Sequence, residues 1–292
     1  MSETGRRQPG EVRGVSWFPG HMLKAQKRLG EEVKNTDVVL ELRDARLPLL
    51  SANPVLEQLS GNRPRLVLFN KASLADPQAS AAWSAYFEAR KLPFLFLDAD
   101  SGKALNLILP HVDKVTQPLL ERYRGRGIRP PMPRLMIAGM PNVGKSTLIN
   151  RLVHANRQKV APMPGVTRHV SWINLKDRYQ LMDSPGVMLP RIASEDDAMR
   201  LCWIGAIKDN ILGADRCAFS LLTFILAHRP AALAQFTGNV DSPQAALDAI
   251  GRARGLLVAG GTVNLGAAAE WLLQHYRSGG LGRFTFELPP TG

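Results

Sequence analysis

One segment determines the fold class of this chain more than any other: Gly139-Met140-Pro141-Asn142-Val143-Gly144-Lys145-Ser146-Thr147. It fits G-x-x-x-x-G-K-[ST] at every fixed position, with an apolar strand-like run before it at 135–138 and an amphipathic helix pattern after it at 148–152. In such a loop, backbone N–H groups and the helix N-terminus surround nucleotide phosphates, Lys145 reaches the β and γ oxygens, and the Ser146 hydroxyl ligates Mg²⁺. We therefore expect residues 142–147 to bind a nucleotide; the alternative is a glycine-rich turn with an incidental Lys.

Length and composition set the frame around this loop. A chain of 292 residues with 45% hydrophobic content suffices for one large α/β domain and a smaller one. Cys202 and Cys217 have no accompanying Cys or His cluster, so neither a disulfide framework nor a zinc site is predicted, and a reducing compartment is expected. The N-terminus lacks an apolar signal core, and the run 218–227 is too short to cross a bilayer. These features predict a soluble, cytoplasmic protein with no membrane partner; a short organellar targeting arm is the alternative.

The positive charge is concentrated in the first two thirds of the chain. Residues 1–194 hold 29 Lys and Arg against 16 Asp and Glu, whereas residues 195–292 hold 8 against 9. The densest parts are 6–28 and the run Arg122, Arg124, Arg126, Arg129 and Arg134. Such a distribution suggests contact with a polyanion, and a solvated basic face without a dedicated partner is the alternative.

Strand and helix patterns alternate before the phosphate loop. Apolar strands are expected at 37–44, 65–69 and 93–97, with helices after Pro19-Gly20 and around 79–90, a loop at 48–54, and an exposed connector at 122–133. This order predicts a mostly parallel sheet with helices on both faces. Ligands of such sheets bind at the carboxyl ends of the strands, where Asn70-Lys71-Ala72-Ser73 and Asp98-Ala99-Asp100 fall.

Two further segments follow the loop. Thr167 precedes strand-like runs at 170–175 and 179–182, and the second run ends in Asp183-Ser184-Pro185-Gly186. An Asp at a strand end before a Pro-Gly turn suits a carboxylate that holds Mg²⁺ through water, with the Gly186 N–H meeting the γ-phosphate. D-x-P-G alone is a common turn, but its place 38 residues after Lys145, with a Thr between, makes it more specific.

Together these residues resemble a translation-factor-class GTPase with circularly permuted motifs. The phosphate loop, Thr167 and 183–186 look like its first three motifs, whereas Asn70-Lys71 looks like the guanine motif and 98–100 like a degenerate fifth motif, both placed before the loop. Permutation is tolerable because domain termini often lie close together. The chain from about Val15 onward resembles the ribosome biogenesis GTPase A family, through the segments 17–22 (WFPGHM), 44–48 (DARLP), 205–209 (GAIKD) and 282–287 (GRFTFE).

The resemblance implies roles for individual residues. Lys145 and Gly186 would act on the phosphates in catalysis, and Thr167 would sense the γ-phosphate beside Mg²⁺, together with Asp183. Asn142 matches a loop Asn associated with K⁺ coordination in related GTPases; a simple turn residue is the alternative. Val187 stands where Ras-like enzymes have a water-orienting Gln, and an apolar side chain cannot orient water. In this family the His of the opening motif is thought to take part, which points to His21; a capping or packing role on Trp17 is the alternative.

Two positions depart from the family pattern in the guanine-binding motifs. The Asp that should accept hydrogen bonds from guanine is Ser73 here, and loss of a charge-assisted bond worth roughly 1.5–3 kcal/mol predicts weaker selectivity. Asp76, three residues on, is the candidate substitute if the loop bends. Asp98-Ala99-Asp100 replaces Ser-Ala-Lys, and the backbone contact of Ala99 with the base should survive.

Residues 195–292 are expected to form a helical domain after a GTPase domain at 1–194. Helices are predicted at 197–211, 214–228, 243–253 and 263–277. The resemblance implies a monomeric GTPase that uses GTP, GDP and Mg²⁺. It also implies that the protein binds a large ribosomal subunit precursor through its rRNA, and that DNA is not a partner. The RNA contact of the helical domain would come from a local patch of Arg252, Arg254, Arg277 and Arg283. The competing hypotheses are a GTP-regulated RNA-binding or tethering module with negligible turnover, and a small-molecule kinase.

Overall fold

The computed structural model describes residues 19–156, 172–183, 192–238 and 240–290. Its centre is a six-stranded sheet of order β3-β2-β1-β4-β6-β5, in which β5 runs antiparallel to β6 and every other neighbouring pair is parallel. The strands are β1 (Val38–Asp44), β2 (Arg65–Asn70), β3 (Phe94–Phe96), β4 (Arg134–Gly139), β5 (Trp172–Leu175) and β6 (Tyr179–Asp183). The predicted parallel sheet is thus confirmed.

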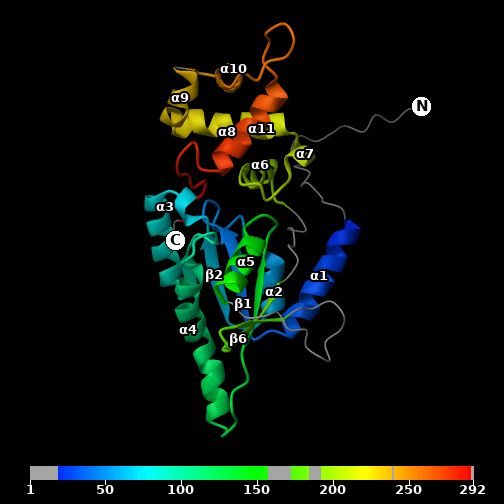
Figure 1. The fold of residues 1–292 in the computed structure, drawn as a ribbon, viewed down its shortest axis with the longest axis vertical. Helices are drawn as coiled ribbons and strands as arrows, with labels where there is room; N and C mark the ends of the chain where they lie inside the picture. Colours follow the sequence, from blue (N-terminus) through cyan, green and yellow to red (C-terminus); the bar gives the residue numbers. More distant parts are fainter. Residues whose placement is uncertain (1–18, 157–171, 184–191, 239, 291–292) are drawn as a thin grey trace, which may run out of the picture.

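Helices cover both faces of this sheet (Figure 1). Along β1, Leu40 and Leu42 pack toward α4 (Ala104–Arg124) and α5 (Lys145–Asn156), whereas Val39 packs toward α1 (Pro19–Lys34) and α2 (Pro54–Ser60). A separate aromatic cluster joins β2 and β3 to α3 (Pro77–Ala89). Because strand side chains alternate between faces, a strand whose residues are all buried, such as β1, must be covered on both.

Two of these elements differ from the sequence expectation. α2 was not predicted, because the sequence indicated only a loop that ends at Pro54. The helix begins at Pro54, where Asn53 caps it and the proline fits the first turn. α4 extends to Arg124, so the expected connector begins with the last turn of a helix that contains Pro110 and Pro118. Its buried face, including Leu105, Ile108 and Val112, follows helical spacing.

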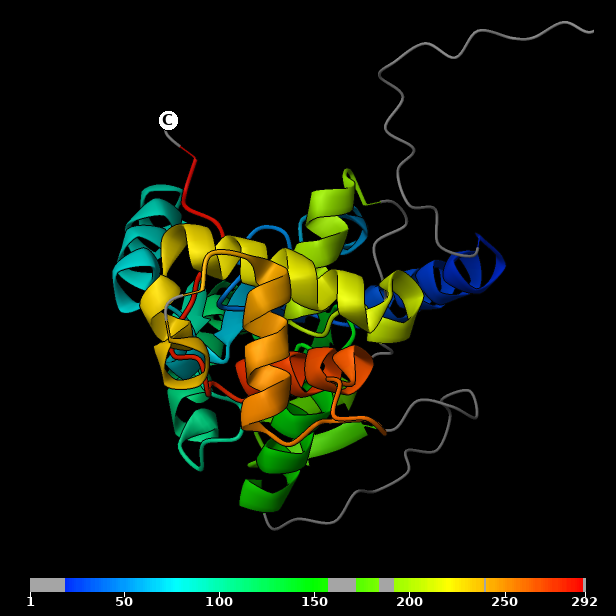
Figure 2. The same cartoon turned by 90° about the horizontal axis from the view of Figure 1, so that it is seen from above.

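The described residues in 192–238 and 240–280 are mostly helical and lie above the carboxyl edge of the sheet (Figures 1 and 2). The elements are α6 (Glu195–Trp203), α7 (Asp209–Leu212), α8 (Ala214–His228), the 3₁₀ helix η2 (Pro230–Leu233), α9 (Ala234–Thr237), α10 (Pro243–Ala253) and α11 (Leu265–Arg277). The single helix expected at 197–211 is wrong, because the chain breaks at Gly205, whose φ of 81° lies in the left-handed region.

The chain returns from α11 to the sheet through a C-terminal strap, which we define as Leu281–Glu287. The Phe284 N–H donates to Leu74 O at 2.9 Å, and the Phe286 N–H donates to Arg46 O at 3.0 Å. Trp83 Nε1 of α3 donates to Glu287 O at 3.0 Å. The strap therefore ties the helical part to the loops that follow β1 and β2.

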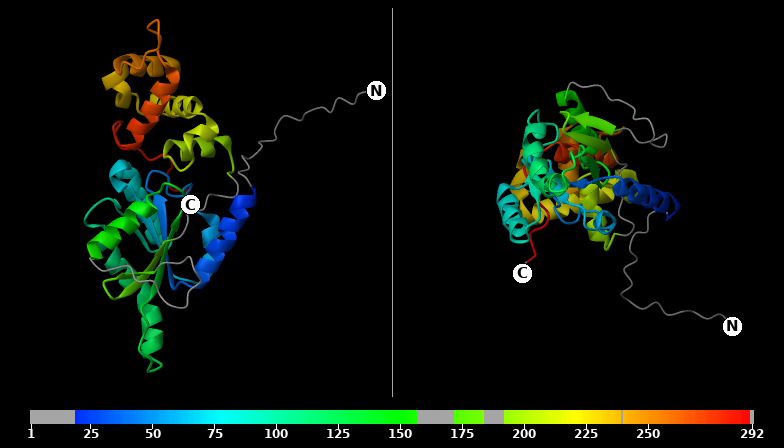
Figure 3. Two further views of the ribbon diagram at one scale, coloured as in Figure 1. Left: turned by 45° about the vertical axis from the view of Figure 1, so that its right-hand side comes forward. Right: turned by 90° about the horizontal axis from the view of Figure 1, so that it is seen from below.

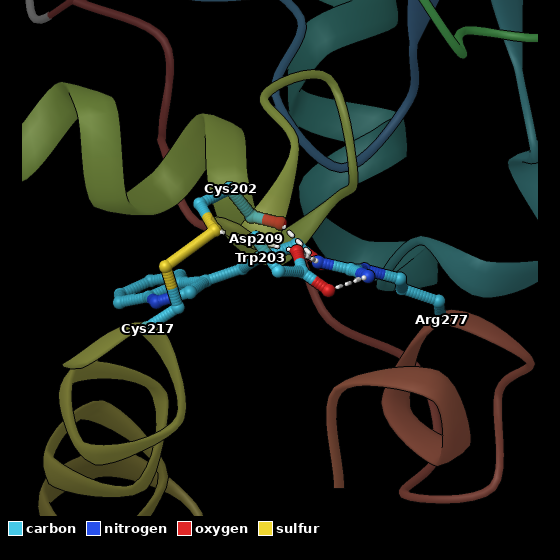
Figure 4. Close-up of a disulfide and its surroundings, with 5 residues drawn as sticks. All are labelled: Cys202, Trp203, Asp209, Cys217 and Arg277. Carbon is cyan, nitrogen blue, oxygen red and sulfur yellow. Dashed lines mark hydrogen bonds and ion pairs between the residues drawn. A yellow bond between two sulfur atoms is a disulfide. The ribbon is translucent and has the colours of Figure 1, made fainter. Parts of the chain in front are cut away.

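Cys202 and Cys217 form a disulfide between α6 and α8, contrary to the sequence expectation (Figure 4). Beside it, the Arg277 guanidinium donates to Asp209 Oδ2 at 2.9 Å and to the Trp203 carbonyl at 3.0 Å. The residues lie far enough apart in sequence that only the packing of the two helices brings the sulfur atoms together. Arg277 therefore stabilises the turn after α6 and is partly buried, and its predicted contact with RNA stays a prediction.

Metal-ligand clusters and membrane-spanning helices are both absent from the described residues. No group of three or more His, Cys, Asp or Glu in this part of the chain is arranged to hold a metal ion. None of its helices has both the length and the apolar character needed to cross a bilayer.

Candidate nucleotide-binding site

The phosphate loop joins β4 to α5, as the sequence predicted. Two glycines are required there by close approach: a Cβ on Gly139 would lie 2.3 Å from Leu42 O, and one on Gly144 would lie 2.1 Å from Asn70 Nδ2. Gly144 also has φ of 106°, which an L side chain rarely adopts. The loop can therefore form only with glycine at these positions.

Lys145 begins α5, and its ammonium is buried in the loop. Nζ donates to Met140 O at 2.7 Å and to Gly139 O at 3.2 Å, so the loop carbonyls hold the charge over the start of the helix. Ser146 and Thr147 follow in the first turn and are exposed, whereas Val143 is buried and fixes the loop on the core. A buried cation, a helix N-terminus and exposed hydroxyls together suit a phosphate chain with a hard cation.

Asn70 connects the guanine motif to this loop. Its Nδ2 donates to Val143 O at 2.7 Å, and its Oδ1 accepts from the Ala99 N–H at 2.7 Å. One buried side chain thus bridges three segments that are widely separated in the sequence. The permuted motifs meet because β1, β2 and β4 are neighbouring parallel strands that end at one edge.

Lys71 is held by the phosphate loop and by Asp44, to which the sequence assigned no role in the site. Its Nζ lies 3.1 Å from Asp44 Oδ2 and donates to Asn142 O at 3.2 Å. Asp44 is fully buried and also pairs with Arg46 at 2.8 Å. Burial works to raise the pKa of Asp44, but the charges of Arg46 and Lys71 outweigh it and hold the pKa below its ordinary value.

Ser73 and Asp98 face each other at the ends of β2 and β3. Asp98 Oδ1 accepts from the Ser73 N–H at 3.0 Å and from the Ser73 hydroxyl at 2.8 Å. The suggestion that Asp76 replaces the missing carboxylate is wrong. Asp76 caps α3, with Oδ1 accepting from the N–H groups of Gln78 and Ala79, and it pairs with Arg229 of the helical part.

Asn142 contacts the helical part directly. Its Nδ2 donates to Gly205 O at 2.9 Å, and its backbone has φ of 57°, which Asn tolerates better than most residues. The turn at Gly205 therefore touches the phosphate loop itself. This contact was not predicted, although the segment 205–209 had been singled out by resemblance.

Several expected site residues lie outside the described residues or have only their backbone described. Thr167, Gly186 and Val187 are outside the described residues. His21 and Asp183 are placed by backbone only, in α1 and at the end of β6. Their assigned roles stay predictions.

Most of the expected basic patch is confirmed as exposed. Arg122, Arg124, Arg126 and Arg129 are exposed at the tip of α4 and just beyond it, at the end of the molecule opposite the helical part (Figures 1 and 3). Arg134 is also exposed, at the start of β4, but its guanidinium lies 5.3 Å from the Trp172 ring centre and donates to Gln180 Oε1 at 3.3 Å. Contacts with the sheet therefore hold this side chain, unlike the arginines at the tip of α4.

Comparison with known proteins agrees with this geometry. A family model described as 50S ribosome-binding GTPase matches residues 134–228, which begin at β4 and include the phosphate loop. Ribosome biogenesis GTPase A of Priestia megaterium is 39% identical over 94% of this chain and 97% of that protein. The chain belongs to the ribosome biogenesis GTPase A family.

Other members and relatives support the same assignment. Ribosome biogenesis GTPase A of Bacillus cereus is 38% identical over 94% of both chains, and a mitochondrial ribosome-associated GTPase 1 of Mus musculus is 35% identical over 73% of this chain and 67% of that protein. The fold matches the solved GNP-bound structure of YlqF from T. maritima with a TM-score of 0.63 and 22% identity, over 91% of this chain and 98% of that one. The present chain is thus a circularly permuted GTPase that binds guanine nucleotides.

Proposed function

We propose that this GTPase is an assembly factor for the large ribosomal subunit, which it binds in the GTP state and leaves after hydrolysis. The observation that supports the proposal is the Asn70 bridge, which joins the expected guanine motif and fifth motif to the phosphate loop despite their permuted order. The family model named for 50S ribosome binding and the exposed arginines at the tip of α4 favour the ribosomal partner.

Mg²⁺ belongs to the proposed site. Ser146 is exposed in the first turn of α5, and the register between β4 and β6 pairs Ile137 with Asp183, which brings the end of β6 beside the phosphate loop. These are oxygen donors of the kind that Mg²⁺ prefers, with Thr167 as a third. The bound ion would neutralise charge on the β and γ phosphates. K⁺ at Asn142 is a further proposal, since its amide oxygen is the type of ligand that a monovalent cation takes.

We further propose a division of labour along the chain. Residues 1–194 would bind and hydrolyse GTP, and residues 195–292 would contact rRNA, with the protein acting as a monomer in the cytoplasm. Every strand that the structure describes precedes residue 184, and the elements from Glu195 onward are helices, which fits this division.

Hydrolysis with and without large-subunit particles tests the proposal. Val187 supplies no side chain to orient water, so intrinsic turnover should be slow and should rise on addition of the particle. His21→Ala should remove most of that rise with nearly unchanged nucleotide affinity, because the side chain would act on the water in the transition state. Small-subunit particles serve as the control.

Two results would count against this function. If large-subunit particles neither bind in the GTP state nor raise turnover, the ribosomal role is wrong. If His21→Ala is stimulated as strongly as the wild type, the role of His21 is wrong while the assembly function stands.

A further inference from the structure

We infer that Asp98 supplies the carboxylate that recognises guanine, in place of the Asp that the guanine motif lacks at Ser73. The inference deepens the guanine nucleotide binding derived above and rests on it. Its starting point is the direct pair between these two side chains: Asp98 Oδ1 accepts from both the hydroxyl and the backbone N–H of Ser73. The family pattern puts Asp in the guanine motif and Ser in the fifth motif, and this chain has the two residues exchanged.

The backbone around Asp98 is fixed relative to the phosphate loop. Phe69 of β2 pairs with Phe96 of β3, so the segments that follow these two strands leave the sheet side by side. The next residue, Ala99, donates from its N–H to Asn70 Oδ1 at 2.7 Å, and Asn70 donates in turn to Val143 O of the loop at 2.7 Å. A base attached to phosphates in the loop therefore meets these segments in one defined position.

The chemistry of the pair assigns the acceptor role to Asp98. A carboxylate has two oxygens and only accepts, whereas a serine hydroxyl has a single proton to donate. Ser73 gives that proton to Oδ1, and within the described part of the chain no protein group donates to Oδ2. Guanine presents two adjacent donors, N1–H and the N2 amino group, which a carboxylate can accept together in a charge-assisted pair. Adenine presents a bare N1 at this edge, which would leave the carboxylate unpaired and facing a lone pair.

The other nearby carboxylates do not compete for this role. Asp76 is committed to the cap of α3 and to Arg229. Asp100 is exposed and lies one residue beyond Ala99 in the same loop, which makes it a matched control for charge and position.

Calorimetric titration of GDP, ADP and xanthosine diphosphate into four variants tests the inference. Asp98→Asn should weaken GDP by about 10- to 100-fold and tighten xanthosine diphosphate, because the new amide N–H₂ can donate to the xanthine 2-oxo group. Asp100→Asn should match the wild type for all three nucleotides. Ser73→Asp alone should not tighten GDP, since it adds a second carboxylate beside Asp98. The exchange Ser73→Asp with Asp98→Ser should restore GDP affinity to within a few-fold of the wild type.

The variants separate a contact with the base from a structural effect. A merely structural role for Asp98 would lower the affinity for all nucleotides and give no gain for xanthosine diphosphate, and that result would overturn the inference. So would a tightening of GDP by Ser73→Asp alone. If the wild type itself does not prefer GDP over ADP, the protein is not specific for guanine. That result would contradict the guanine specificity itself, whichever residue provides it.

Discussion

At the scale of single residues, a buried ion pair holds the guanine motif in place. Asp44 and Arg46 are both almost fully buried and pair at 2.8 Å, and the same carboxylate holds Lys71. Removing one partner of a buried pair leaves an uncompensated charge, which costs far more than losing a surface pair. The pair thus couples the stability of the fold to the placement of Lys71 beside the phosphate loop.

Asp44→Asn is expected to lower the free energy of unfolding at neutral pH by about 3–5 kcal/mol. The folded pKa of Asp44 is lowered, so its contribution is complete above the unfolded pKa of about 3.9 and is lost as the pH falls below that value. The difference between wild type and variant should therefore shrink in acid. Urea unfolding at pH 7 and near pH 3 measures it.

The matched control for this prediction is Asp248→Asn, which breaks the exposed pair with Arg252. It should cost less than about 1 kcal/mol, with little dependence on pH. Equal costs for the two variants would show that the Asp44 pair does not act as a buried ion pair.

Much of the site could be predicted at this scale, but its side-chain pairings could not. The glycines, Lys145 and Asn70 occupy fixed positions of their motifs, so the motif spacing already specifies them. The Ser73–Asp98 pair depends on which way two side chains turn at the ends of separate strands, and sequence spacing carries no information about that. The same holds for Cys202 and Cys217.

At the scale of elements, local capping signals decided which helices could be predicted. α8 and α10 have the bounds expected from the sequence: α8 follows Gly213, and Ser242 with Pro243 marks the start of α10. α4 was missed because Pro110 and Pro118 interrupt its pattern, and each removes a backbone hydrogen bond. Burial of one face against β2, β3 and α5 offsets that loss.

The exposed end of α4 should make phosphate contacts on the particle. Replacing Arg122, Arg124 and Arg126 with Ala is expected to flatten the dependence of log Kd on log salt by about 0.7–0.9 per lost contact, if coefficients for single strands and B-DNA transfer. Binding to large-subunit particles over a salt series measures the slope. Arg134→Ala is the control, because this side chain packs on Trp172. An unchanged slope in the triple variant would make this surface a solvated face.

At the scale of the whole molecule, the two parts share a continuous apolar core. Buried residues connect from the α4 and α5 face of the sheet to the interior of the helical part without a break. Within the strap, Phe286 stacks with Phe284 and contacts the rings of Trp203, Phe224 and Tyr276. We therefore expect the described fold to unfold in one cooperative transition.

Phe286→Ala should uncouple the two parts. Removing a buried ring costs about 3–5 kcal/mol, and here the loss falls on the contact that joins them. Thermal unfolding followed by far-ultraviolet circular dichroism and by tryptophan fluorescence should coincide in the wild type and separate in the variant. Leu288→Ala, at an exposed position two residues on, should leave the transitions coincident. Coincident transitions in Phe286→Ala would mean that the strap does not carry the coupling.

The strap also restricts how the helical part can move. This part is joined to the sheet covalently after β6, and again through the bonds of Phe284 and Phe286 to Leu74 and Arg46. Any motion that lifts Gly205 from Asn142 while the strap stays bound must therefore pivot about the contacts of Phe284 and Phe286 with the loops after β2 and β1.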